Sequence, residues 1–271
     1  MLFLSEFYIV LKGLWFVKCF SFVTWHPNMS RYFIEIAYNG ADFHGWQKQP
    51  NAPSVQETIE KCLFKQFGNT EVPIVGCGRT DAGVHAKQYF FHLDLTSEVD
   101  EIQFVYKLNR MFPKGIAAYS MKEVTPDLHA RFDAKKRTYR YFIHQSKNPF
   151  REELSWYFPH DLDFEKMNEA AKLLLGEKDF GSFAKAHTDV KTNICSVFSA
   201  EWIADENGYY FEISANRFLR NMVRAIVGTL IDIGTGKLEL ADIPKILAAK
   251  NRQEASLSVP GHALFLWQID Y

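Results

Sequence analysis

Closely spaced cysteines and an excess of positive charge are both absent from this chain of 271 residues. Its four cysteines, at 19, 62, 77 and 195, lie far apart and form no Cys-x-x-Cys pair. The sequence therefore predicts neither a zinc site nor a disulfide framework, and it favours a reducing compartment, the cytoplasm. The formal net charge is −1, so a nucleic-acid ligand would need a local basic patch.

The first 28 residues lack the periodic pattern found in the rest of the chain. Residues 2–25 are rich in Leu, Phe, Val and Trp, and Glu6, Lys12 and Lys18 are their only charges. These interspersed charges, and the lack of an Ala-x-Ala cleavage site, argue against a signal peptide or a membrane anchor. We expect residues 1–29 to be an apolar extension outside the fold, with Met29 as the natural start.

Hydrophobic periodicity divides the remaining chain into two halves of similar order. In the first half, strands are expected over 31–38, 72–77, 87–95 and 116–122, and helices from the capping box at 54–57 and over 101–110. In the second half, strands are expected over 136–145, 194–203, 209–215 and 263–269, and helices over 164–174, 217–233 and 240–249. The β-α-β-β-α-β order is that of the split βαβ motif.

The prediction is therefore an α+β fold of two ferredoxin-like halves, residues 30–134 and 135–271. Their mainly antiparallel sheets would pack side by side, with an active-site cleft between them, because ligand sites favour such interfaces. The composition, 47% hydrophobic and 15% aromatic, is typical of a well-packed globular protein.

One carboxylate, Asp81, lies in a glycine-framed loop two residues after Arg79. Glycines at 76, 78 and 83 permit backbone angles that other residues adopt at a cost, so the loop can bend tightly around a substrate. An acid beside a guanidinium suits a nucleophile or an electrostatic catalyst. An ordinary turn closed by Asp81, with Arg79 as its surface partner, fits the local pattern equally well.

Positive charge gathers in residues 131–151, where seven Lys and Arg face a single acid, Asp133. Tyr139 and Tyr141 alternate with these cations. Cations neutralise phosphates and aromatic rings stack on unpaired bases, so the segment indicates RNA binding. A solvated edge strand whose lysines prevent aggregation is the alternative.

The predicted helix over 217–233 carries Arg217, Arg220 and Arg224 at i, i+3 and i+7, which places them on one face. The residues around Arg224 are apolar, which predicts a largely buried helix. A buried guanidinium needs a carboxylate partner, and Asp81 is the best candidate.

Four segments together resemble the bacterial tRNA pseudouridine synthase A family, from about residue 31 to the C-terminus. The resemblance lies in an opening motif over 38–57, a catalytic-aspartate motif over 78–86, a tyrosine motif over 129–141 and an arginine-bearing helix over 218–230. It implies a homodimer that isomerises uridines 38, 39 and 40 of the tRNA anticodon stem-loop to pseudouridine, without metal or cofactor.

The same resemblance implies roles for single residues. Asp81 would be the nucleophile, Tyr139 would pack on the target base, and Arg224 would pair with Asp81. Arg79 would bind phosphate and help to evert the nucleotide. The substrate-binding set would consist of Arg79, Arg137, Tyr139, Leu219 and Arg220.

The chemistry leaves several roles open. The carboxylate of Asp81 can attack C1′, add to C6 or remove the C2′ proton. Tyr139 is a candidate for removing the C5 proton, although a phenol pKa of about 10 makes this difficult.

Two other functions fit parts of the sequence. A metal-dependent hydrolase would use Asp81, His85 and His92, although Gly83 argues against a helix that joins the first two. A non-catalytic RNA-binding module accounts for residues 131–151. It leaves Asp81 beside RNA phosphates unexplained, because an anion there opposes binding.

Overall fold

The computed structural model describes residues 29–185 and 191–271. Residues 1–28 lie outside the described part, and the predictions made for the N-terminal extension stay predictions. Within the described ranges, no helix is both long and apolar enough to cross a lipid bilayer.

The fold is a mixed arrangement of strands and helices around one large sheet. The strands are β1 (Ser30–Tyr38), β2 (Val75–Gly76), β3 (His85–Leu95), β4 (Ile116–Val124), β5 (Lys136–His144), β6 (Trp156–Tyr157), β7 (Gly176–Asp179), β8 (Ile194–Asp205), β9 (Gly208–Ala215) and β10 (Leu264–Asp270). The helices are α1 (Val55–Gln66), α2 (Glu101–Met111), α3 (Phe164–Lys172), α4 (Met222–Gly234) and α5 (Asp242–Ala249). Two short 3-10 turns, η1 (Gly181–Phe183) and η2 (Gly261–Ala263), complete the described elements.

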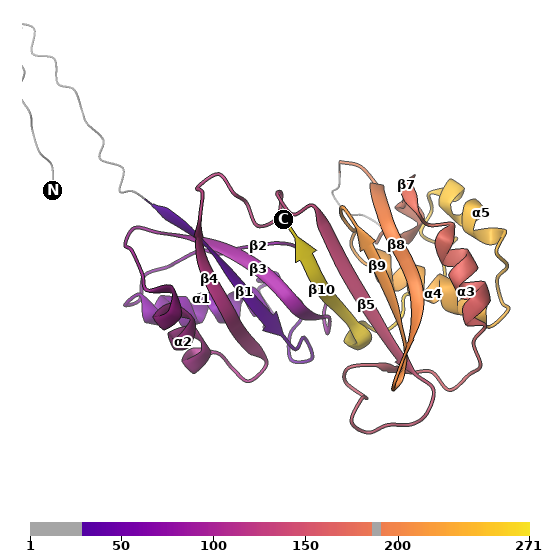
Figure 1. Cartoon of the computed structure of the whole chain (residues 1–271), viewed down its shortest axis with the longest axis horizontal. Helices are drawn as coiled ribbons and strands as arrows, with labels where there is room; N and C mark the ends of the chain where they lie inside the picture. Colours follow the sequence, from indigo (N-terminus) through magenta and orange to yellow (C-terminus); the bar gives the residue numbers. More distant parts are fainter. Residues whose placement is uncertain (1–28, 186–190) are drawn as a thin grey trace, which may run out of the picture.

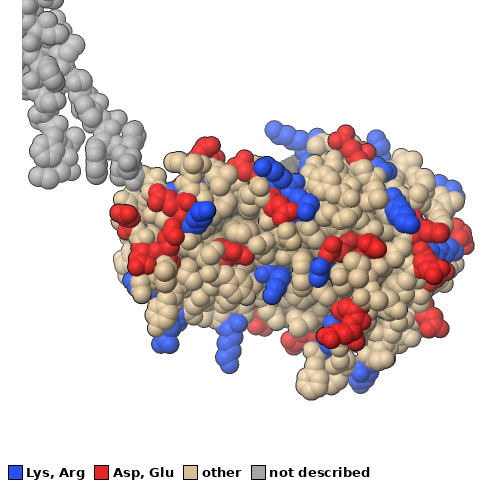
Figure 2. Space-filling view, in the orientation of Figure 1, with Lys and Arg blue, Asp and Glu red and all other residues tan. Residues whose placement is uncertain are grey.

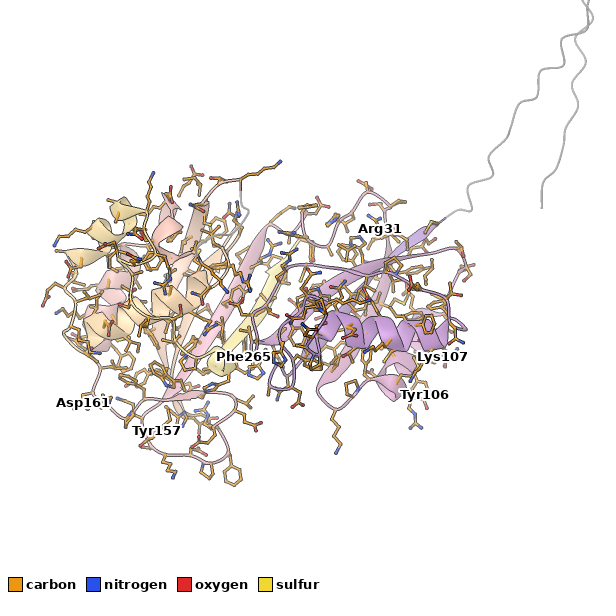
Figure 3. The ribbon with its side chains drawn as sticks, turned by 180° about the vertical axis from the view of Figure 1, so that it is seen from behind. Arg31, Tyr106, Lys107, Tyr157, Asp161 and Phe265 are labelled. Carbon is orange, nitrogen blue, oxygen red and sulfur yellow. The ribbon has the colours of Figure 1, made fainter. Side chains whose placement is uncertain are left out.

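The described strands form a single sheet in the order β4-β1-β3-β10-β5-β9-β8-β7, with β2 paired to β3 and β6 to β5 (Figure 1). Most pairs are antiparallel, as predicted, but β5 and β6 pair in parallel, and so do β3 and β10, which join the two halves. The halves are therefore parts of one continuous sheet and not two sheets packed side by side. Figure 3, seen from behind, shows the helices in front of this sheet, with Phe265 marking β10 between the two groups.

The two halves repeat one strand order. The sequence β4-β1-β3-β2 in the N-terminal half corresponds to β10-β5-β9-β8 in the C-terminal half. Each half has its own apolar core, but Val84 packs in the C-terminal core, and Leu266 and Ile269 pack in the N-terminal one. The cores thus interlock where β3 meets β10.

Local signals explain where several helices begin. The Ser54 hydroxyl accepts a hydrogen bond from the Glu57 backbone N–H at 3.2 Å, which confirms the predicted cap of α1. Asp100 and Asp163 cap α2 and α3 in the same way. In each case the side chain satisfies a backbone donor that the first helical turn leaves unpaired.

The prediction for the arginine helix is wrong at its start. Helix α4 begins at Met222, not at 217, because Asn221 adopts a left-handed backbone with φ of 67°. Arg217 and Arg220 therefore precede the helix and do not share a helical face with Arg224. The strand expected over 72–77 is also shorter and spans Val75–Gly76.

Candidate active site

The loop that carries Asp81 lies between β2 and β3 and is held by the end of β1 and the segment that follows it. The Trp46 N–H donates to the Thr80 carbonyl at 3.3 Å. The hydroxyls of Tyr38 and Thr80 lie 2.9 Å apart. The Gly83 N–H donates to the Phe43 carbonyl at 3.2 Å. These bonds fix the backbone on both sides of Asp81.

The three framing glycines serve different purposes. Gly83 has a φ of 74°, so the prediction of an unusual backbone angle is confirmed there. Gly76 lies so close to Tyr89 and Trp46 that a side chain would collide with them. Gly78 has neither feature, because a Cβ there would meet nothing within 4 Å.

Two arginines from the C-terminal half face the Asp81 carboxylate. Nη1 of Arg224 lies 3.8 Å from Oδ2, and Nε of Arg220 lies 3.5 Å from Oδ1. Within the described ranges these are the ion pairs of Asp81, and Arg79 is not among them, which contradicts the ordinary turn with Arg79 as its partner. The predicted pair of Asp81 with Arg224 is confirmed.

This site is less buried than the sequence suggested. The side chains of Arg224 and Asp81 are 22% and 23% exposed, and that of Arg220 is 59% exposed. Arg224 also donates through Nε to the Val259 carbonyl at 2.7 Å. One edge of its guanidinium is thus held by the backbone while another faces Asp81.

Tyr139 lies on β5, half-buried between the two cores, with its ring 5.1 Å from that of Phe218 in an edge contact. Burial raises the pKa of Tyr139 well above its ordinary value, and the negative charge of Asp81 acts in the same direction. Arg137 opposes this shift. Because its pKa is raised, the phenol stays protonated and is poorly suited to act as a general base. Its neutral ring suits packing against a nucleobase.

The other proposed substrate-binding residues fall into two groups. Arg79 is exposed on the Asp81 loop, and Arg220 is exposed beside the carboxylate. Leu219 is only 5% exposed and belongs to the C-terminal core. Arg137 donates to four backbone carbonyls, those of Cys77, Arg131, Ala134 and Asn216, and so ties the Asp81 loop to β5.

Much of the positive charge in residues 131–151 is neutralised by acids. Ion pairs join Lys136 to Asp270 at 2.8 Å, Arg140 to Glu212 at 2.7 Å and Arg151 to Asp205 at 3.9 Å. Figure 2 shows acidic and basic side chains interspersed over one face of the molecule. Arg131, Lys135 and Lys147 remain exposed.

The structure does not support the set of metal ligands that a hydrolase would need. His85 accepts at Nδ1 from the Gly40 N–H at 3.0 Å and donates from Nε2 to the His262 carbonyl at 2.8 Å, so both ring nitrogens are engaged. Nδ1 of His92 accepts from the Ala130 N–H at 3.1 Å. No group of three or more His, Cys, Asp or Glu is arranged to hold a metal ion in residues 29–185 or 191–271.

Sequence reasoning missed the segment before β10, residues 252–262, which we name the C-terminal strap. Its Val259 carbonyl binds Arg224, and its His262 carbonyl binds His85. At Gly261, a Cβ would lie 2.7 Å from the Ala82 carbonyl oxygen. The strap thus contacts both the arginine helix and the Asp81 loop, mostly through backbone atoms that give no sequence signal.

Comparisons with known proteins identify the family of the chain. A family profile described as tRNA pseudouridine synthase matches residues 170–271. A protein named tRNA pseudouridine synthase A from Parabacteroides distasonis is 51% identical over 244 residues, which cover 90% of this chain and 96% of the relative. Relatives of the same name from Bacteroides fragilis and Bacillus subtilis are 50% and 37% identical, and the matches cover 90% and 87% of this chain and 97% of each relative. The chain therefore belongs to the tRNA pseudouridine synthase A family and is an isomerase of that family.

Proposed function

We propose that this chain converts uridines 38, 39 and 40 of the tRNA anticodon stem-loop to pseudouridine, with Asp81 as the nucleophile. The observation that carries the proposal is the Asp81 carboxylate, held on a pinned loop and faced by Arg220 and Arg224 at 3.5 and 3.8 Å. Opposite charges on two sides restrict where the carboxylate can point. Such preorganisation is what a positioned catalytic group requires.

The isomerisation breaks the N1–C1′ bond, turns the uracil and joins C5 to C1′, after which C5 loses its proton and N1 gains one. The detached uracil stays bound and is reused, so one carboxylate suffices, whereas a glycosidase needs a second carboxyl group for its leaving group or its water. The reaction involves no net oxidation or hydrolysis, and the proposal includes no metal and no cofactor. Asp81 would attack C1′ or add to C6, and removal of the C2′ proton is the third route to be distinguished.

The target base must leave its stack before the carboxylate can reach it, at a cost of about a few kcal/mol. Tyr139 would pack on the everted base, and its half-buried, neutral ring supports this role. Arg79 and Arg220, both exposed near Asp81, would bind phosphate, with Arg79 helping to evert the nucleotide. Arg137 and Leu219 would support the substrate site rather than lie on its surface. Arg137 is bound to backbone carbonyls, and Leu219 is buried.

We further propose two ferredoxin-like halves, residues 30–134 and 135–271, with the substrate cleft where they meet. The repeated strand order supports the division into halves. The placement of the cleft is supported by the ion pairs, because Asp81 comes from one half and its arginines come from the other. The active form would be a homodimer that acts on tRNA in the cytoplasm.

The test is incubation of the protein with unmodified tRNA, followed by carbodiimide modification and primer extension to map pseudouridine. The wild type should modify positions 38–40, and Asp81→Asn should modify none while still binding tRNA. Tight tRNA binding with no pseudouridine formed by the wild type would favour the non-catalytic RNA-binding module instead.

A further inference from the structure

Arg252, in the C-terminal strap, is a half-buried cation whose side-chain hydrogen bonds, among the residues that the structure describes, all stay within the strap. Its guanidinium donates to the carbonyls of Ala255 and Ser256 at 3.0 and 2.9 Å and to the Ser258 hydroxyl at 2.9 Å. No carboxylate in the described part of the chain forms an ion pair with it. Burial lowers the pKa of Arg252, as expected for a cation removed from water without an acid.

These bonds fold the strap into a turn that docks on α4. The Ser258 hydroxyl, held by Arg252, also accepts from the Asn221 side-chain amide at 2.5 Å, at the start of the helix. The Ser256 N–H donates to the Thr229 hydroxyl at 3.2 Å. Gly228 lies against the Leu257 carbonyl, where a Cβ would collide. The strap is therefore fastened to the helix over two turns.

The residue after Ser258 contacts the ion pair at the centre of the site. Val259 accepts from Nε of Arg224 at 2.7 Å, and its own N–H donates to the Arg224 carbonyl at 3.3 Å. The bond from Nε restrains the orientation of the guanidinium plane, and Nη1 faces Asp81. A displaced strap would turn this plane away from the carboxylate.

We propose that Arg252 is a positioning residue for the ion pair of Arg224 with Asp81, acting through Ser258 and the Val259 carbonyl. The inference rests on the proposed catalytic role of Asp81. It assigns to Arg252 no contact with tRNA.

Arg252→Lys and Arg252→Met test the proposal, with Lys245→Met, an exposed cation on α5, as the matched control. The measurements are the single-turnover rate constant at saturating tRNA and the dissociation constant for tRNA. Both Arg252 variants should lose roughly 10-fold to 100-fold in rate, because small misplacements of catalytic groups cost this much. The dissociation constant should stay within about twofold of the wild type, since the inference gives Arg252 no phosphate to bind.

The lysine variant separates positioning from charge. A single ammonium cannot reproduce the fork that reaches three oxygens, so Arg252→Lys should be impaired like Arg252→Met. Weaker tRNA binding in Arg252→Met that Arg252→Lys restores would show a phosphate contact and overturn the proposal. Wild-type rates in both variants would overturn it as well.

Ser258→Ala gives an independent test that keeps the arginine in place. It should slow the rate with unchanged tRNA binding, and adding Arg252→Lys should cause little further loss, because both changes break one connection. Independent, multiplying losses would contradict the proposed path. If Asp81→Asn stays active, the proposed function fails, whereas normal Arg252 variants beside an inactive Asp81→Asn overturn the positioning role alone.

Discussion

Replacing Arg224 with methionine is the substitution that most directly probes the ion pair at the centre of the site. Arg224→Met keeps an unbranched apolar stem but removes every donor. Of its two ion-pair partners in residues 29–185 and 191–271, Asp81 then retains Arg220, whose side chain is 59% exposed. The Val259 carbonyl, in a residue only 5% exposed, loses the donor that reaches it at 2.7 Å.

The magnitude follows from distance and exposure. Two unit charges 3.8 Å apart attract by about 4 kcal/mol at an effective dielectric constant of roughly 20. Because both side chains are more than a fifth exposed and Arg220 stays in place, we reduce this to about 1 kcal/mol. An unsatisfied buried carbonyl adds about 1–3 kcal/mol. We expect a loss of about 2–4 kcal/mol in the free energy of unfolding and a decrease of about 100-fold in turnover.

Urea denaturation measures the stability change, and single-turnover pseudouridine formation measures the catalytic one. Lys135→Met, at an exposed position in the basic segment, is the comparison and should change the free energy of unfolding by less than about 0.5 kcal/mol. Arg220→Met should cost about 0–1 kcal/mol, as expected for an exposed ion pair. Equal and mild effects of Arg224→Met and Lys135→Met on both measurements would refute the reasoning.

Three further predictions concern acid stability, the glycines and metal. Burial lowers the pKa of His92 to about 4, so the unfolded chain takes up the proton first, and the free energy of unfolding should fall as the pH drops from about 6.5 toward 4. His92→Gln should flatten this decline in urea titrations at several pH values; an unchanged slope would contradict the assignment of the decline to the buried His92 ring. Gly45→Ala should lower both stability and activity, because Gly45 has a φ of 95° and its Cβ would collide with the Thr80 carbonyl, whereas Gly78→Ala should leave the unfolding free energy unchanged. Equal unfolding free energies for these two variants would contradict the steric argument. Protein treated with a chelator and then dialysed should keep its activity; a loss that zinc or another metal restores would revive the hydrolase.

The most successful sequence predictions relied on local patterns or on simple charge pairing. Alternating apolar residues located β1, β3 and β5, because a half-buried strand needs that period. The partner of Arg224 was found by asking which acid a weakly solvated guanidinium requires. Both arguments depend on rules that hold without knowledge of the whole fold.

The predicted start of α4 is wrong because the backbone of a single residue, Asn221, interrupts the helix, and that residue is held by a distant part of the chain. Residues 217–221 have the arginine spacing and apolar content of a helix, but Asn221 adopts a left-handed backbone, which asparagine tolerates better than most residues. Its side-chain amide is held by Ser258, far along the chain. Nothing in the sequence near Asn221 predicts that contact.

The charge of the basic segment was overestimated because pairing partners depend on strand register. Arg140 lies opposite Glu212 on β9, and Lys136 lies opposite Asp270 on β10. These acids are more than 70 residues away in sequence, so counting charges along the chain leaves them out. The C-terminal strap was missed because its contacts to Arg224 and His85 use backbone carbonyls, which every residue carries.

The most direct test of the central claim is the mapping of pseudouridine in unmodified tRNA after incubation with wild-type protein and with Asp81→Asn. We predict modification of uridines 38, 39 and 40 by the wild type and none by Asp81→Asn, with tRNA binding retained in the variant. Pseudouridine formed by Asp81→Asn at the wild-type rate would contradict the account.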